Sequence, residues 1–197
     1  DMYCVYLGQA LQTVNPPNAS VGLSQLTATG TKDATTFLRG DNTFASAGGT
    51  NTPFFIARKT SDQVINSGST TKLTFEATDT ESSSGIFDLS NNKFTVATAG
   101  KYNISINVYH YDSDNNIIRS DGYIYKNNAA YAQWINDRGS DQDERGLQVG
   151  GSIIMNLSVN DYIEAYALAT TSDSGSVNIE GSSTLLLTYI SAFKLIT

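Results

Sequence analysis

The sequence is poor in the side chains that carry most enzyme chemistry, with one cysteine and one histidine among 197 residues. A single cysteine, Cys4, excludes an intrachain disulfide and a thiolate-rich metal site. The single histidine, His110, ends the inward-facing row of an alternating strand, so we expect it to pack in the core rather than act as a base. The sequence has no G-x-S-x-G motif, which would carry a serine nucleophile. One histidine and one cysteine are also too few to form a catalytic zinc site. We therefore predict no enzyme activity, catalytic residue, metal site or cofactor; a hydrolase built on loop carboxylates is the distant alternative.

Basic residues and long apolar runs are also scarce. Twelve Lys and Arg stand against nineteen Asp and Glu, which gives a formal net charge of −7. An acidic surface without a basic cluster repels a phosphate backbone, so nucleic acid is not an expected partner. No apolar run is long enough to span a membrane, and no signal-peptide pattern begins the chain. We predict no membrane insertion. Because the chain begins at Asp1 rather than Met, we expect it to be a processed piece or the end of a longer protein.

Proline is rare, whereas Gly, Ser, Thr and Asn are abundant and accompany eleven Tyr and eight Phe. This mixture favours short strands joined by tight turns. Alternating apolar and polar residues predict strands at 54–56, 72–77, 94–96, 102–111, 117–126, 129–136, 147–157, 161–169, 176–180 and 185–196. Because no helical period accompanies them, the sequence predicts an all-β sandwich or barrel.

The composition divides the chain into three segments. Residues 1–14 are predicted to form a strand with two apolar faces and no partner before residue 53. We expect this strand to close the sheet of an upstream domain, with pairing to the main domain as the alternative. Residues 15–52 are small and polar with spaced apolar anchors, which predicts an extended stalk shared by several chains, or else a flexible linker. Residues 53–197 hold the main run of strands and form the predicted head domain.

The last predicted strand, residues 185–196, has apolar side chains on both faces. One face holds Leu185, Leu187, Tyr189, Phe193 and Leu195. A surface strand of a monomeric sandwich has one polar face, so the second face requires cover, which a neighbouring subunit supplies most simply. We therefore predict a subunit interface made by Leu186, Ile190, Ala192 and Ile196.

Two polar segments are candidate sites. The charged segment 137–145 is predicted as a recognition loop, because loops carry specificity on rigid sandwiches; an ordinary solvated loop is the alternative. The candidate residues in it are Asp137, Arg138, Asp141, Asp143 and Arg145. Segment 112–116 has oxygen-bearing side chains at alternate positions, as a calcium loop does. Ile117 stands where that loop needs glycine and Tyr123 where it needs glutamate, so we predict a hairpin tip instead.

Residues 34–45, ATTFLRGDNTFA, resemble a linker that recurs in bacteriophage tail fibres. There a run of small residues is followed by F-L-R-G-D-G-T/S-W/F, and the motif precedes the next domain. Asn42 stands here in place of the usual glycine, and asparagine also tolerates a positive φ. Residues 39–41 spell Arg-Gly-Asp, the tripeptide by which adhesion proteins bind integrins. The resemblance to the fibre linker explains this tripeptide without an integrin partner. Residues 1–14 are similar to the closing strand of the repeat that precedes such linkers.

Residues 53–197 resemble the jelly rolls of complement globular-head and tumour-necrosis-factor proteins. Residues 94–104 fit their F-x-V-x-x-x-G-x-Y-x-F/I core. Residues 152–163 are similar to S-x-x-x-x-L-x-x-G-D-x-V, with Asn160 in place of glycine, and residues 189–195 are similar to the final aromatic strand. The resemblance implies a jelly-roll β-sandwich that forms a compact homotrimer about an apolar axis and binds without catalysis.

The two resemblances together imply the C-terminal part of a phage fibre whose trimeric head adheres to a host surface glycan or receptor. The expected location is the virion, and the expected partners are two further copies of the chain and other virion proteins. The implied mechanism is avidity, with three weak sites on one rigid tip. The alternative is a purely structural role, as a capsid decoration or a trimerisation cap.

Overall fold

The structure is a computed structural model that describes residues 2–3, 18, 22, 27–46, 51–139 and 143–195. Two units make up the chain, residues 1–49 and residues 50–197, and each is described by itself. The strand predicted at residues 1–14 lies outside the described residues except for Met2 and Tyr3, which belong to no strand. None of the described residues is helical.

The first unit contains a short antiparallel hairpin within the segment predicted as a stalk. Strand β1 (Thr36–Leu38) pairs with β2 (Phe44–Ser46). Asn42 in the connecting turn has a φ of 61°, a left-handed conformation that asparagine adopts more readily than most residues. The Asp41 carboxylate accepts hydrogen bonds from the Thr43 N–H and hydroxyl at 3.1 and 2.6 Å. The turn therefore accommodates asparagine where the fibre linker usually has glycine.

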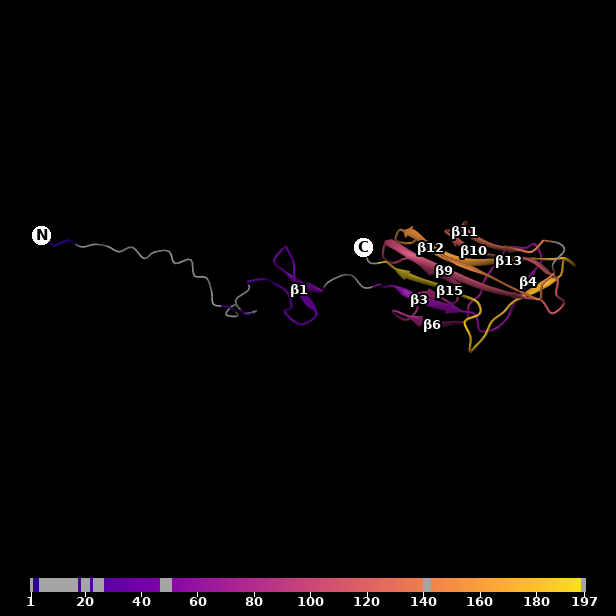
Figure 1. Cartoon of the computed structure of the whole chain (residues 1–197), viewed down its shortest axis with the longest axis horizontal. Coiled ribbons are helices and arrows are strands. Elements are labelled where there is room, and N and C mark those ends of the chain that lie inside the picture. Colours follow the sequence, from indigo (N-terminus) through magenta and orange to yellow (C-terminus); the bar gives the residue numbers. More distant parts are fainter. Residues whose placement is uncertain are drawn as a thin grey trace. The chain divides into compact units, whose positions relative to one another are not determined.

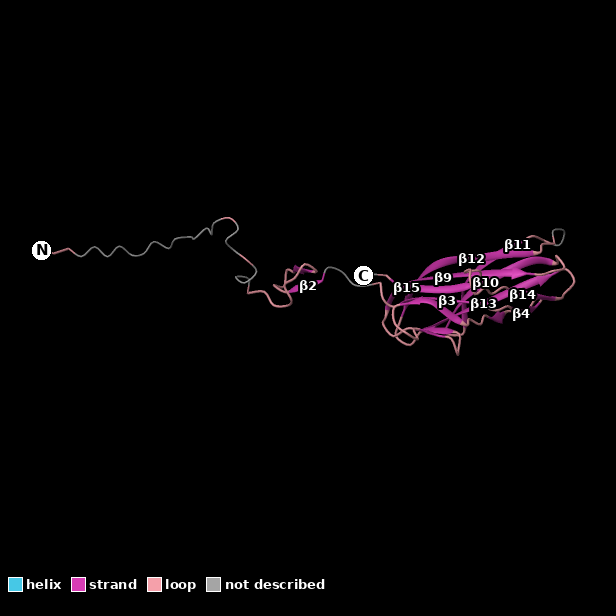
Figure 2. Ribbon diagram, turned by 90° about the horizontal axis from the view of Figure 1, so that it is seen from below, coloured by secondary structure: helices cyan, strands magenta, loops and turns pink. Residues whose placement is uncertain are grey.

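The second unit, the head, is a sandwich of two antiparallel sheets (Figure 1, Figure 2). Its strands are β3 (Phe54–Arg58), β4 (Gln63–Asn66), β5 (Thr71–Lys72), β6 (Ala77–Glu81), β7 (Phe87–Asp88), β8 (Lys93–Thr95), β9 (Gly100–Tyr111), β10 (Ile117–Lys126), β11 (Ala129–Asp137), β12 (Gly146–Leu157), β13 (Tyr162–Thr171), β14 (Ser176–Ile179) and β15 (Tyr189–Lys194). The six-stranded sheet has the order β11-β10-β13-β8-β7, with β5 paired to β13. The seven-stranded sheet has the order β4-β14-β9-β15-β3-β6, with β12 paired to β9. The predicted all-β sandwich is confirmed.

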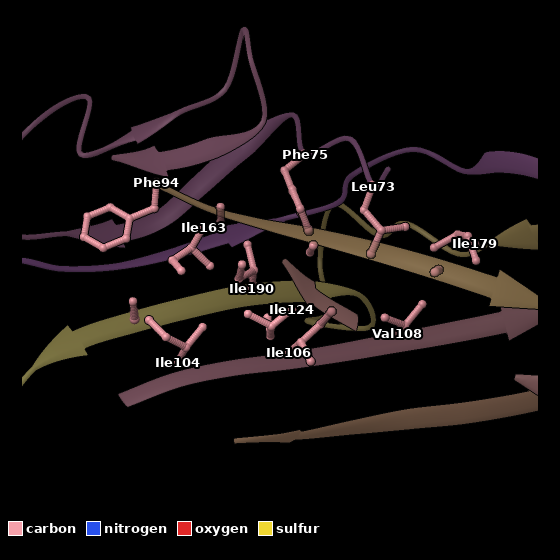
Figure 3. Close-up of a cluster of buried hydrophobic side chains, with 14 of the residues drawn as sticks. Leu73, Phe75, Phe94, Ile104, Ile106, Val108, Ile124, Ile163, Ile179 and Ile190 are labelled. Atoms are coloured by element: carbon pink, nitrogen blue, oxygen red, sulfur yellow. The ribbon is translucent and has the colours of Figure 1, made fainter. Parts of the chain in front are cut away.

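The core lies between the two sheets, where the inward side chains of their alternating strands meet (Figure 3). The predicted inward row of β9 is at most 2 % exposed at every position, and it comprises Tyr102, Ile104, Ile106, Val108 and His110. An aromatic cluster fills one part of the core. The Phe55 ring in this cluster lies 5.1 Å from both the Phe87 and the Phe94 ring, measured between centroids. Ring burial of this kind is a large part of what stabilises a small sandwich.

The strand predicted at residues 72–77 is interrupted, because β5 ends before and β6 begins after residues 73–76. Leu73 and Phe75 are nevertheless buried, as the alternation predicted. The Phe75 N–H donates to the Asn92 side-chain oxygen at 2.6 Å instead of to a neighbouring strand. A side chain that satisfies a backbone group can thus replace the sheet ladder without changing which residues face the core.

Segment 112–116 is not the hairpin tip that the sequence predicted. β9 belongs to the seven-stranded sheet and β10 to the six-stranded sheet, so this segment crosses from one sheet to the other. The Asn116 side chain donates to the Asp173 carboxylate at 3.0 Å, and the Asp114 N–H donates to the Asp112 carboxylate at 3.0 Å. Turn residues have the same composition in a hairpin and in a crossover, so composition identified the turn but not the strands that it joins.

Two of the four residues predicted for the subunit interface lie in the core instead. β15 covers only Tyr189–Lys194 and lies between β9 and β3 of the same chain. Ile190 and Ala192 are 0 % and 3 % exposed, and Figure 3 shows Ile190 among the core side chains. The second sheet of the same chain covers this face, so no neighbouring subunit is needed there. Leu186 precedes β15 and is 41 % exposed, while Ile196 lies outside the described residues.

Candidate binding surfaces

The first half of the predicted recognition loop is exposed and follows β11 directly. Asp137 ends that strand, and its carboxylate accepts the Gly139 N–H at 2.9 Å. The Arg138 N–H donates to the Ile118 carbonyl oxygen at 2.8 Å. Asp141 lies outside the described residues. The start of the loop is therefore held by backbone contacts, and the side chain of Arg138 is exposed.

The second half of the loop is held to two other segments of the head. The Asp143 carboxylate accepts a hydrogen bond from the Ser172 hydroxyl at 3.0 Å. The Arg145 guanidinium lies over the Tyr111 ring, 5.2 Å from its centroid, which is cation–π geometry. No ion pair joins an arginine to a carboxylate among the described residues of this loop. The predicted residues therefore share a loop, but they do not converge on a common point.

The outward face of the seven-stranded sheet carries apolar side chains on three of its strands, β12, β15 and β3, in a row that crosses β9 at Asn103. Ile154 on β12 pairs with Asn103 on β9, Asn103 pairs with Phe193 on β15, and Phe193 pairs with Phe54 on β3. Ile154 is 61 % and Phe193 37 % exposed. Phe54, Phe193 and the nearby Ile56 line a shallow hollow. We call Ile154, Phe193, Phe54 and Ile56 the apolar face.

One polar atom within this row has no hydrogen-bonding partner. The Asn103 side-chain oxygen is buried and accepts no hydrogen bond from the described residues. An unpaired buried carbonyl of this kind is uncommon and costs free energy, because it has lost its water without replacement. The apolar face therefore combines exposed hydrophobic surface with an unpaired acceptor that is closed to solvent within the chain.

The outward face of the six-stranded sheet carries tyrosines on adjacent strands. Tyr123 and Tyr125 of β10 pair with Tyr166 and Glu164 of β13. The Tyr125 and Tyr166 rings are stacked, with centroids 4.0 Å apart, and Tyr123 meets Tyr125 edge-on at 6.2 Å. All three tyrosines are partly exposed. We call Tyr123, Tyr125, Tyr166, Asp121 and Glu164 the tyrosine face.

A fixed polar network borders these rings. The side chain of Asp121 is fully buried and accepts two hydrogen bonds from Arg119, at 2.8 and 2.7 Å. It also accepts from the Tyr123 hydroxyl at 2.8 Å and from the Gln133 amide at 2.9 Å. Burial opposes ionisation of Asp121, but these bonds outweigh it and hold its pKa below the usual value. Burial and the Asp121 carboxylate raise the pKa of Tyr123 to about 12, so its hydroxyl stays protonated at neutral pH.

The sequence did not predict the tyrosine face. Alternation places Tyr123 and Tyr125 on one side of their strand, and Tyr162 and Tyr166 on one side of theirs. That signal was available, but it does not show that two strands about forty residues apart are neighbours. Strand pairing between β10 and β13 is what brings the tyrosines together.

The single histidine lies in the core of the head. His110 is 0 % exposed, so the prediction that it packs in the core is confirmed. In the part of the chain that the structure describes, no three His, Cys, Asp or Glu side chains group to hold a metal ion. No helix among those residues is long and apolar enough to cross a membrane.

The head is similar to solved jelly-roll structures. Murine APRIL at pH 8.0 matches with a TM-score of 0.52 and 10 % identity, over 73 % of this chain and 98 % of that one. The globular domain of zebrafish complement 1qA matches with a TM-score of 0.49 and 11 % identity, over 73 % and 97 %. The Eiger tumour necrosis factor of S. frugiperda matches with a TM-score of 0.49 and 12 % identity, over 73 % and 93 %. No protein-family model and no curated protein matches the chain.

The similarity to APRIL defines the fold class of the head. The APRIL match covers nearly all of that structure, and together with the two antiparallel sheets it confirms the predicted jelly-roll β-sandwich of the complement and tumour-necrosis-factor type. At 10 % identity the similarity concerns the fold alone, because one fold supports many unrelated functions. Function has to be argued from the two faces of the sandwich.

Proposed function

We propose that the chain forms the trimeric, non-enzymatic head of a phage fibre and attaches the virion to the surface of its host. The observation that carries the proposal is the apolar face. Exposed apolar strips of this length usually mark a contact with another molecule. In a cyclic homotrimer each copy meets two others, so one copy can cover the apolar row of the next.

The hairpin of the first unit supports an assembly of several chains. Phe37 and Leu38 are 61 % and 48 % exposed on a two-stranded sheet, and an isolated two-stranded hairpin is marginally stable in water. Further copies of the hairpin supply the apolar contacts that one copy lacks. The resemblance of residues 34–45 to a phage fibre linker supports the fibre, and the jelly-roll fold supports the trimeric head.

Replacing Phe193 or Ile154 with aspartate is expected to convert trimers to monomers. Each substitution places an unpaired charge at an apolar contact point of the interface, which weakens assembly by at least about a hundredfold. Light scattering coupled to size exclusion measures the mass. The matched control is Ile135→Asp, since Ile135 is 52 % exposed on the opposite sheet. An Ile154→Asp and Phe193→Asp protein that remains trimeric, or a wild type that is monomeric, would contradict the apolar face as the subunit contact.

Fluorescently labelled wild-type trimer is expected to stain susceptible host cells. Three linked sites raise the apparent affinity by about 100-fold or more over a single head, so Phe193→Asp monomers should stain weakly at the same head concentration. Flow cytometry measures the difference. A wild-type trimer that stains no cells across a host panel would contradict attachment and favour the structural alternative, a capsid decoration or trimerisation cap.

A further inference from the structure

The charges on the tyrosine face cancel in pairs. Arg119 pairs with Asp121 at 2.7 Å, and Lys72 pairs with Glu164 at 2.5 Å. The chain as a whole carries a net charge of −7. A face that is locally neutral on an acidic protein neither attracts a polyanion nor uses its carboxylates to attract a cation, so it fits an uncharged ligand.

One carboxylate oxygen on this face lacks a partner. The Glu164 side chain is 7 % exposed, and its Oε1 is bonded to Lys72. Its Oε2 is buried and accepts no hydrogen bond within the described structure. A buried carboxylate oxygen without a donor is costly, and Glu164 is the cross-strand neighbour of Tyr125. An unpaired acceptor is therefore present beside the stacked rings, and a donor from outside the chain reaches it once a neighbouring side chain moves.

We infer that the tyrosine face binds a neutral saccharide. A sugar ring has an apolar C–H side, which packs against aromatic rings, and hydroxyl groups around its edge, which require donors and acceptors in fixed positions. Tyr123, Tyr125 and Tyr166 supply the aromatic surface, and tyrosine is ordered at low entropic cost because it has few rotatable bonds. Glu164 Oε2 accepts a sugar hydroxyl, and the polar network around Asp121 borders the same rings.

Access to the free oxygen depends on Lys72. This lysine stands on β5, a strand of two residues, opposite Tyr166, and its side chain is 32 % exposed. It also donates to the Asn91 carbonyl oxygen at 2.7 Å, so it can leave the carboxylate and keep a hydrogen bond. A sugar hydroxyl then occupies the position that the Lys72 ammonium group has left beside Glu164. The affinity of each single site is weak, because only one short row of rings contacts the sugar.

This inference deepens the proposed function, on which its biological meaning rests, by naming the ligand class. The tyrosine face and the apolar face lie on opposite sheets of the sandwich. When the neighbouring copy meets the apolar face with a patch other than the tyrosine face, the trimer leaves three tyrosine faces free. Three weak sugar sites on one rigid head are suited to a surface polymer with repeated units.

The test uses the full chain and a panel of neutral hexasaccharides built from glucose, galactose, mannose or N-acetylglucosamine. Polysialic acid is the anionic comparator, and calorimetric titration gives the affinity. At least one neutral hexasaccharide is expected to bind and polysialic acid is not. Tyr125→Ala is expected to weaken binding at least about tenfold. Tyr125→Phe keeps the ring, so its affinity should lie within about twofold of the wild-type affinity. Normal binding by this variant shows that the loss in Tyr125→Ala comes from the missing ring.

Two further variants sharpen the result. Glu164→Gln keeps the size of the side chain and is expected to weaken binding by several-fold, because an amide has one acceptor oxygen instead of two. Tyr3→Ala removes a tyrosine that is 88 % exposed in the first unit and should leave the affinity unchanged. Binding of no neutral hexasaccharide, or equal binding by wild type and Tyr125→Ala, overturns the sugar site.

Cell staining separates this inference from the proposed function. Staining that is lost after mild periodate treatment of the cells, which oxidises sugar diols, supports the sugar site. Staining that survives this treatment shows a protein receptor, and it overturns the sugar site while leaving attachment intact. Purified hexasaccharide that binds in the absence of any stained host supports the sugar site and contradicts the attachment function.

Discussion

Phe55→Ala is expected to lower the free energy of unfolding of the head by about 3–5 kcal/mol. Phe55 is 1 % exposed and lies between the rings of Phe87 and Phe94. Truncation removes both ring contacts and leaves a cavity, and the sheets around it cannot collapse because their strands are fixed by hydrogen bonds. Urea denaturation followed by circular dichroism measures the change. A loss of this size is a large fraction of the stability of an ordinary domain.

The control for this prediction is Phe37→Ala. Phe37 is 61 % exposed on β1, so its truncation should change the unfolding of the head by less than about 0.5 kcal/mol. The neighbouring substitution Phe54→Ala separates the two faces of one strand, because Phe54 faces outward. Its main effect is expected on trimer mass rather than on unfolding. A loss below about 1 kcal/mol for Phe55→Ala would show that the aromatic cluster is not the centre of the core.

The parts of the fold that could be predicted from the sequence are those set by local alternation. The inward row of β9 is the clearest case, because five side chains alternate with polar ones over a strand that is buried on one side. Short strands were harder. β7 has two residues, which is too few for a period to be recognised. In β4 the apolar residues Val64 and Ile65 are adjacent instead of alternating, and both strands were missed.

The parts that could not be predicted depend on which strand lies beside which. Ile190 and Ala192 have the same apolar character whether a second sheet or a second subunit covers them. The sequence showed that both sides of the final segment require cover, and the structure shows that the side with Ile190 is the core. On the outward side of β15, Phe193 is an apolar side chain beside polar neighbours such as Ser191. The apolar surface for assembly is thus built from residues of β3, β12 and β15 rather than along one strand.

The tyrosine face illustrates the same limit for the candidate site. Charged loops are visible in a sequence as continuous segments, so residues 137–145 were an obvious candidate. The tyrosines of β10 and β13 are separated in sequence and meet only through strand pairing. The Lys72–Glu164 pair joins residues 92 positions apart, and no local pattern signals it.

The head is expected to lose stability as the pH falls from about 6.5 to about 4, because of His110. Burial lowers the pKa of this histidine from 6.5 to about 4, against the opposing charge of Asp121. Below pH 6.5 the unfolded chain binds a proton that the folded chain does not, so stability is full above the unfolded pKa and declines toward the folded one. The slope is about 1.4 kcal/mol per pH unit, which amounts to about 3 kcal/mol by pH 4. Urea denaturation at a series of pH values measures it.

His110→Leu is expected to flatten this pH dependence, because leucine has no group to titrate and fits an apolar core position. Two carboxylates with lowered pKa values affect stability over a different pH range. Asp88 and Asp161 have pKa values of about 2, so their contribution to the stability of the folded head is present above pH 4 and is lost as the pH falls toward 2. A decline between pH 6.5 and 4.5 that persists in His110→Leu would therefore assign the effect to a group other than the buried histidine. A decline that vanishes in the variant shows that one uncharged imidazole in the core sets the acid limit of the head.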